Sequence, residues 1–175
     1  VSNGLYTGST LWLIGASDGS YSVLEQDEED PVLEREALSS AAGFLLGYSA
    51  AGNVSRAFTL NDEGDQSSEA FLGLADFDGD MVVAGTTNGD FASGGVVSGM
   101  EQGIAARVSL VPEPETEEEE SEFRNNWRYQ LAADDSAILD LENYRDDEIP
   151  ALTRIGNNWY VLLFSPEGEL LTPLN

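Results

Sequence analysis

The chain repeats itself at a long spacing, and this repetition limits the folds open to it more than any other feature. The segment LWLIGASDGSY at residues 11–21 aligns without gaps with MVVAGTTNGDF at residues 81–91, an offset of 70. In both segments four apolar residues precede a glycine, a second glycine follows, and an aromatic residue comes last. A weaker third copy, YVLLFSPEGEL at residues 160–170, has Phe164 in place of the first glycine. We therefore expect about two and a half structural repeats.

The segments that follow these copies also correspond. GFLLGYS at 43–49 matches GIAARVS at 103–109 at an offset of 60, and VSRAFTL at 54–60 matches NWRYQL at 126–131 at an offset of 71. The second unit is therefore 11 residues longer, and the surplus falls on VPEPETEEEES at 111–121. Prolines and repeated glutamates predict an exposed loop there, inserted between two strands of a single domain that spans residues 1–175.

Each unit consists of short β-branched or aromatic runs separated by Gly, Asn, Asp and Ser, which is typical of antiparallel strands joined by turns. In the second unit we expect strands near residues 70–76, 81–87, 103–110 and 126–132. Four strands in each unit predict an all-β fold of antiparallel, propeller-like units rather than a solenoid. One helix is expected in DPVLEREALSS at 30–40, with Asp30 as its N-cap and Pro31 at its first position.

The order of these segments resembles the bacterial surface β-propeller repeats often called SBBP-type repeats. The resemblance covers most of residues 11–131 and is strongest over GFLLGYSAAGNVSRAFTLNDEGDQSSEAFLGLADFDGDMVVAGTTNGDF at 43–91. It implies a surface location, and it places the aspartate-glycine element at the turn between the first two strands of a blade. A closed propeller needs at least about four blades, more than this chain supplies. Because the edge of an open blade exposes unpaired backbone groups and invites pairing, we expect an oligomer or a larger parent.

The charge of the chain excludes several functions. There are 33 acidic and 7 basic residues, so the net charge is −26 and both nucleic acids and anionic membrane surfaces would be repelled. All basic residues are arginines, and lysine, histidine and cysteine are absent, which removes imidazole and thiolate metal sites and Schiff-base chemistry. The apolar runs are far shorter than the roughly 20 residues of a membrane-spanning helix, so we expect no membrane insertion.

The stretch LADFDGDMVVAG at 74–85 permits two interpretations. Asp76, Asp78 and Asp80 alternate like carboxylate ligands, and calcium is the one cofactor that this pattern leaves open. The spacing does not match an EF-hand, because glycine stands at position 4 and Thr87 stands at position 12 of a loop counted from Asp76. Asp78-Gly79 is also a favoured pair for a two-residue hairpin turn, which we prefer.

We expect a non-catalytic extracellular or cell-surface module for binding or assembly, with a protein, a glycan or another copy as its partner. Val1 opens a strand-like stretch without an initiator methionine, so we expect a processed chain or a fragment of a longer one, and a removed export signal would fit. Two alternatives stay open: a carboxylate-based glycoside hydrolase or carbohydrate-binding module, and a structural subunit completed by another chain. Five aromatic residues are candidates either for stacking on sugars or for core packing, namely Trp12, Tyr48, Trp127, Trp159 and Tyr160.

Overall fold

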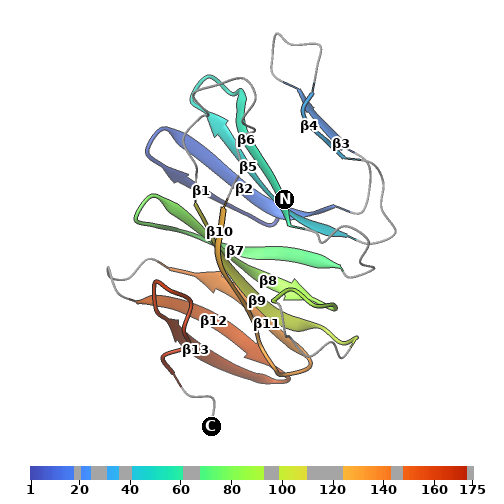
Figure 1. Ribbon diagram of the computed structural model, residues 1–175, viewed down its shortest axis with the longest axis vertical. Coiled ribbons are helices and arrows are strands. Elements are labelled where there is room, and N and C mark those ends of the chain that lie inside the picture. Colours follow the sequence, from blue (N-terminus) through green and yellow to red (C-terminus); the bar gives the residue numbers. More distant parts are fainter. Residues whose placement is uncertain are drawn as a thin grey trace.

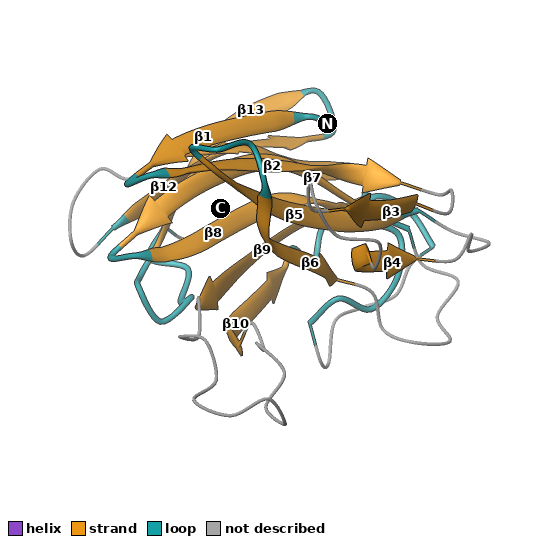
Figure 2. Ribbon diagram, turned by 90° about the horizontal axis from the view of Figure 1, so that it is seen from above, coloured by secondary structure: helices purple, strands orange, loops and turns teal. Residues whose placement is uncertain are grey.

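The computed structural model describes residues 1–17, 21–24, 31–35, 41–60, 68–92, 99–109, 124–142 and 148–172. These residues form strands and loops, and no helix occurs among them (Figure 2). Every strand pairing in this part of the chain is antiparallel. The prediction of an all-β, antiparallel fold is therefore confirmed.

The N-terminal sheet has four strands in the order β1-β2-β5-β6. These are β1 (Asn3–Thr7), β2 (Thr10–Ser17), β5 (Ala42–Ser49) and β6 (Val54–Leu60). Two-residue turns such as that between β1 and β2 need a residue that tolerates positive φ, and Gly8 supplies it with φ of 59°. The segment that carries the first sequence copy is the second strand of this sheet.

The central sheet has the same arrangement of consecutive strands, β7-β8-β9-β10. Its strands are β7 (Glu69–Phe77), β8 (Asp80–Thr87), β9 (Gln102–Ser109) and β10 (Arg124–Gln130), which confirms all four strands expected in the second unit. The second sequence copy lies on β8, again the second strand, so the gapless alignment identified equivalent strands. The acidic stretch 111–121, which we expect to be a loop, lies outside the described residues.

The C-terminal sheet has three strands, β11 (Ser136–Leu141), β12 (Ile149–Ile155) and β13 (Asn158–Phe164), in that order. The weak third copy begins on β13, so it is the third strand of its sheet and not the second. The first position belongs to β11, a strand that the sequence comparison did not predict. Beyond β13 the chain turns back, and an isolated bridge joins Phe164 to Leu170.

The three sheets stack face to face in chain order, with the central sheet in the middle (Figure 1). We call the side of each sheet that lies toward the preceding sheet its backward face and the opposite side its forward face. One core lies between the N-terminal and central sheets and includes Trp12, Ile14, Met81 and Val83. The other lies between the central and C-terminal sheets and includes Val82, Ala84, Ile149, Leu162 and Phe164. Successive residues of β8 thus point alternately into one core and into the other, as the two-residue period of a strand requires.

A separate two-stranded sheet, β3 (Tyr21–Leu24) and β4 (Pro31–Arg35), lies between β2 and β5 in the sequence. The helix expected at 30–40 is therefore wrong over Pro31–Arg35, where the backbone pairs with β3 through Val23 and Leu33. Proline lacks an N–H, and it is accepted at the first residue of a strand as readily as at the first position of a helix. Asp30 and residues 36–40 lie outside the described residues.

Candidate functional site

The DFDGD stretch forms the turn between β7 and β8. Phe77 pairs with Asp80, and the two residues between them, Asp78 and Gly79, have φ of 54° and 83°. Positive φ at both central positions is the signature of a type I′ turn, whose twist matches that of the flanking strands. The preferred interpretation of this stretch as a two-residue hairpin turn is confirmed.

The three aspartates of this turn have different surroundings. Asp78 is exposed at the tip. Asp76 accepts hydrogen bonds from the Gly79 backbone N–H, at 3.2 Å, and from the Thr7 hydroxyl of the N-terminal sheet. Asp76 pairs with Met81, whereas Asp80 pairs with Phe77, so the side chains of Asp76 and Asp80 lie on opposite faces of the hairpin. Their carboxylates do not converge, and the calcium site stays a prediction.

Asp80 instead holds Arg107 against the C-terminal turn. Its Oδ2 accepts a hydrogen bond from Arg107 Nε at 2.7 Å, and both side chains are largely buried, with 17% and 16% exposed. Arg107 Nη1 also donates to the Pro166 carbonyl at 3.1 Å, and its guanidinium lies 5.1 Å from the centre of the Phe77 ring. This cluster ties the central sheet to the residues that follow β13, which is a structural role.

The five aromatic candidates divide into packing residues and surface residues. Trp12 is buried in the core, and Trp127 stacks on Phe164 while its indole N–H donates to the Pro166 carbonyl at 2.8 Å. Core packing is therefore confirmed for these two. Trp159 and Tyr160 are exposed on β13, with 61% and 37% of their surfaces accessible. Tyr48 is half-buried on β5.

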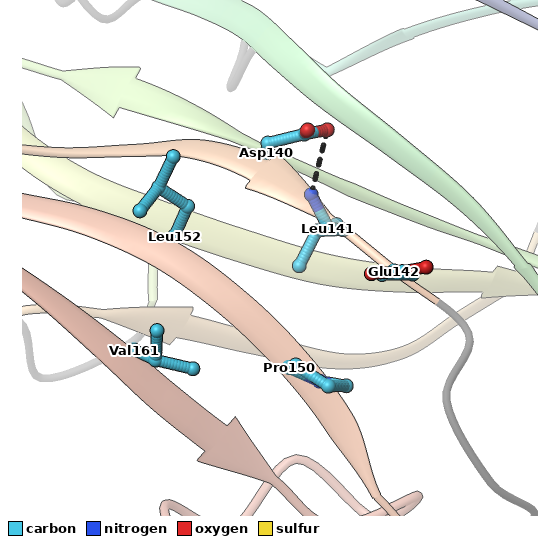
Figure 3. A pocket seen from close by; sticks show the side chains of 6 residues that line it. All are labelled: Asp140, Leu141, Glu142, Pro150, Leu152 and Val161. Carbon is cyan, nitrogen blue, oxygen red and sulfur yellow. Dashed lines mark hydrogen bonds between the residues drawn. The ribbon is translucent and has the colours of Figure 1, made fainter.

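The forward face of the C-terminal sheet carries the best candidate site. A pocket of about 180 Å³ is lined there by Asp140, Leu141, Glu142, Pro150, Leu152 and Val161. Figure 3 shows Leu152 and Val161 on the neighbouring strands β12 and β13, with the carboxylates of Asp140 and Glu142 on the β11 side. Leu152 pairs with Val161, and Arg154 pairs with Trp159 in the same ladder. The side chains of Leu152, Trp159 and Val161 extend the pocket into an apolar surface.

Charged groups border this surface. Arg154 Nη1 donates to Asp135 Oδ1 at 2.8 Å, and Arg154 Nη2 lies 3.4 Å from Glu101 Oε2. The hydrogen bond to Asp135 is the main cause that raises the pKa of Arg154 above its ordinary value, so the guanidinium stays charged. Asp140 and Glu142 are both exposed. An apolar centre with a charged margin is the usual composition of a protein-binding surface.

The backward face of the N-terminal sheet is the second apolar surface. Tyr6 pairs with Leu11, and Leu11 pairs with Tyr48, so the three side chains form a row across β1, β2 and β5. Tyr6 is 64% exposed and Leu11 is 40% exposed. Sequence reasoning named Tyr48 but missed Tyr6 and Leu11. It also missed Leu152 and Val161, although NWYVLLF shows no polar residue between its apolar ones, a pattern that indicates a strand covered on both faces.

No protein-family model matches this chain, and no curated protein matches it either. In the described part of the chain, no helix has the length and apolar character that a membrane crossing needs.

Proposed function

We propose that this protein is a non-catalytic β-repeat module of the cell surface or extracellular space, which binds a protein partner or assembles through the apolar outer faces of its sheet stack. Its sheets serve as successive propeller-like units, in keeping with the resemblance to SBBP-type repeats. Calcium binding by Asp76, Asp78 and Asp80 stays a separate prediction, since the turn that carries them forms from backbone preferences.

One observation carries the proposal: apolar side chains are buried on both faces of the central sheet, whereas part of the outer face of each end sheet exposes apolar side chains. On β8 every residue from Met81 to Thr87 is buried. On β13 of the C-terminal sheet, Trp159 and Val161 are each more than 60% exposed. Clustered apolar side chains of this size on a surface mark an interaction site.

A glycoside hydrolase is the second candidate, because the pocket holds the carboxylates of Asp140 and Glu142. Such enzymes place one carboxylic acid in apolar surroundings as the general acid and a second carboxylate opposite to it. Asp140 and Glu142 are both exposed at the same side of the pocket, and Asp140 accepts a hydrogen bond from the Leu141 N–H at 3.0 Å. This geometry favours binding over hydrolysis.

The test separates binding from catalysis. We expect no turnover of a panel of aryl glycosides, and we expect a dye that fluoresces on apolar surfaces to bind the protein and to bind Val161→Glu more weakly. If the wild type hydrolyses an aryl glycoside and Glu142→Gln does not, the protein is a glycoside hydrolase and the proposed function is wrong. Ala132→Glu is the matched control, because it adds the same charge at an exposed position outside both strands and pocket.

A further inference from the structure

The described residues form two interfaces between stacked sheets, one between the N-terminal and central sheets and one between the central and C-terminal sheets. In both, the forward face of one sheet packs against the backward face of the next. At the offset of 70, Trp12 and Ile14 correspond to Val82 and Ala84, and all four side chains lie on forward faces. Leu11 and Leu13 correspond to Met81 and Val83, the backward-face residues of the central sheet. Both contacts among the three stacked sheets, in the part of the chain that the structure describes, therefore join a forward face to a backward face.

Two glycines give independent evidence that the two interfaces are equivalent. Gly43 on β5 and Gly103 on β9 occupy corresponding positions at the offset of 60. A Cβ at Gly43 would lie 2.7 Å from the Phe71 ring, and one at Gly103 would lie 3.1 Å from Ile138 Cγ1. Phe71 is on β7 and Ile138 is on β11, the first strand of the following sheet in each case. A glycine in the third strand thus admits a side chain of the next sheet at both interfaces.

The two outer faces of the stack are the backward face of the N-terminal sheet and the forward face of the C-terminal sheet, and they are equivalent to the two faces that meet at each internal interface. The backward face of the N-terminal sheet is exposed at one end, where Leu11 is 40% exposed although its counterpart Met81 is 1% exposed. Farther along the same face, Phe44 and Leu46 are each 8% exposed. The C-terminal sheet has an exposed forward face, with Leu152 and Val161 at its centre. Each molecule therefore presents one backward face and one forward face to solvent. Apolar rows would meet on docking, and the hydroxyls of Tyr6 and Tyr48 are donors suited to carboxylates such as Asp140 and Glu142.

We propose that the backward face of the N-terminal sheet docks on the forward face of the C-terminal sheet of a second copy of this chain. The proposal rests on the proposed function and names the partner and the two surfaces. The contact is heterologous, so repetition gives a ring where the rotation closes and a filament where it does not. Each copy carries a charge of −26, so association strengthens as salt shortens the screening length from about 10 Å at 0.1 M to about 3 Å at 1 M.

Sedimentation equilibrium of two face variants tests the proposal. Leu11→Glu blocks only the backward face, and Val161→Glu blocks only the forward face. Because each variant buries an unpaired carboxylate in the contact, each alone should lose self-association by about 30-fold or more. An equimolar mixture should recover association but stop at dimers, since only one productive pair of faces remains. The control Ala132→Glu should assemble like the wild type.

Two results would overturn the proposal. One is a wild-type protein that stays monomeric at every concentration at both about 0.1 M and about 1 M sodium chloride. The other is continued assembly of Leu11→Glu while Val161→Glu is monomeric, which would mean that like faces pair. Unfolding curves verify that the variants fold, and Tyr6→Glu and Leu152→Glu replace either one that does not. A monomeric wild type leaves the non-catalytic binding role standing, whereas glycoside turnover removes that role whatever the state of assembly.

Discussion

The central sheet and the N-terminal sheet share one strand pattern but differ in what covers them. β2 and β8 are both second strands, both follow a two-residue turn, and both begin with a run of four apolar residues after the first position. Met81 is 1% exposed because the N-terminal sheet covers it, whereas Leu11 at the same place is 40% exposed. The repeated pattern therefore specifies a strand with two apolar faces, and the position of the sheet in the stack decides how many faces are buried.

The largest expected effect comes from truncating this matched pair. Met81→Ala removes a side chain from the core between two sheets and should lower the free energy of unfolding by about 2–5 kcal/mol. Leu11→Ala removes a partly exposed side chain and should cost less than about 1 kcal/mol in the monomer. Urea unfolding at low protein concentration measures both. Equal losses would show that the outer face of the N-terminal sheet is as tightly packed as the inside of the stack.

The ion pairs give the next contrast. Asp80→Asn removes the charge that pairs with Arg107 in a largely buried setting, and should cost about 1–3 kcal/mol because a hydrogen bond between charged groups is lost. Asp135→Asn removes a partner of Arg154 on the surface, where solvent screens the pair, and should cost less than about 1 kcal/mol. Asparagine also tolerates the positive φ of residue 135. A larger loss for the surface variant would reverse the comparison.

A smaller effect is confined to alkaline pH. Tyr129 on β10 packs edge-on against Phe164, with the ring centres 4.9 Å apart, and burial raises its pKa. The folded protein then holds the phenol proton more tightly than the unfolded chain does. This contribution to stability is present below the ordinary pKa of about 10 and is lost as the pH rises through the folded-state pKa. In Tyr129→Phe, the fall in unfolding free energy above about pH 10 should be shallower.

Short-range signals in the sequence predicted most of the fold. The repeat found β2, β5 and β6 and all four strands of the central sheet, because glycines and apolar runs recur wherever one sheet must pack closely on the next. Gly103 illustrates the constraint, since a Cβ there would lie 3.1 Å from Ile138 Cγ1 of the C-terminal sheet. The C-terminal sheet was not predicted because β11 has no counterpart at the repeat spacing. Seven residues, in place of a two-residue turn, separate β11 from β12.

The candidate site was harder to predict than the strands. Exposure of Val161 and Tyr6 depends on which sheet ends the stack, and this is a property of the assembled layers that no local pattern encodes. The aspartates of DFDGD attracted attention because carboxylates are chemically distinctive, whereas an apolar residue in a strand looks the same whether a neighbouring sheet covers it or not. The helix expected at 30–40 failed over Pro31–Arg35 for a related reason, because one proline signal serves both a helix and a strand.

The smallest expected effect decides between the two interpretations of the DFDGD stretch. Asp78→Asn keeps a residue that tolerates positive φ before Gly79, so the turn between β7 and β8 should form as before and the unfolding free energy should change by less than about 0.5 kcal/mol. Asp78→Ala is the matched comparison, since alanine disfavours that φ and should destabilise the hairpin by about 1 kcal/mol.

Thermal unfolding in chelator, in sodium chloride and in low calcium completes the test. General screening of the acidic chain responds alike to sodium and calcium salts of equal ionic strength, whereas a site that uses Asp76, Asp78 and Asp80 responds to calcium at far lower concentration. Strong stabilisation of the wild type by low calcium, absent in Asp78→Asn, would show that the turn also binds the metal.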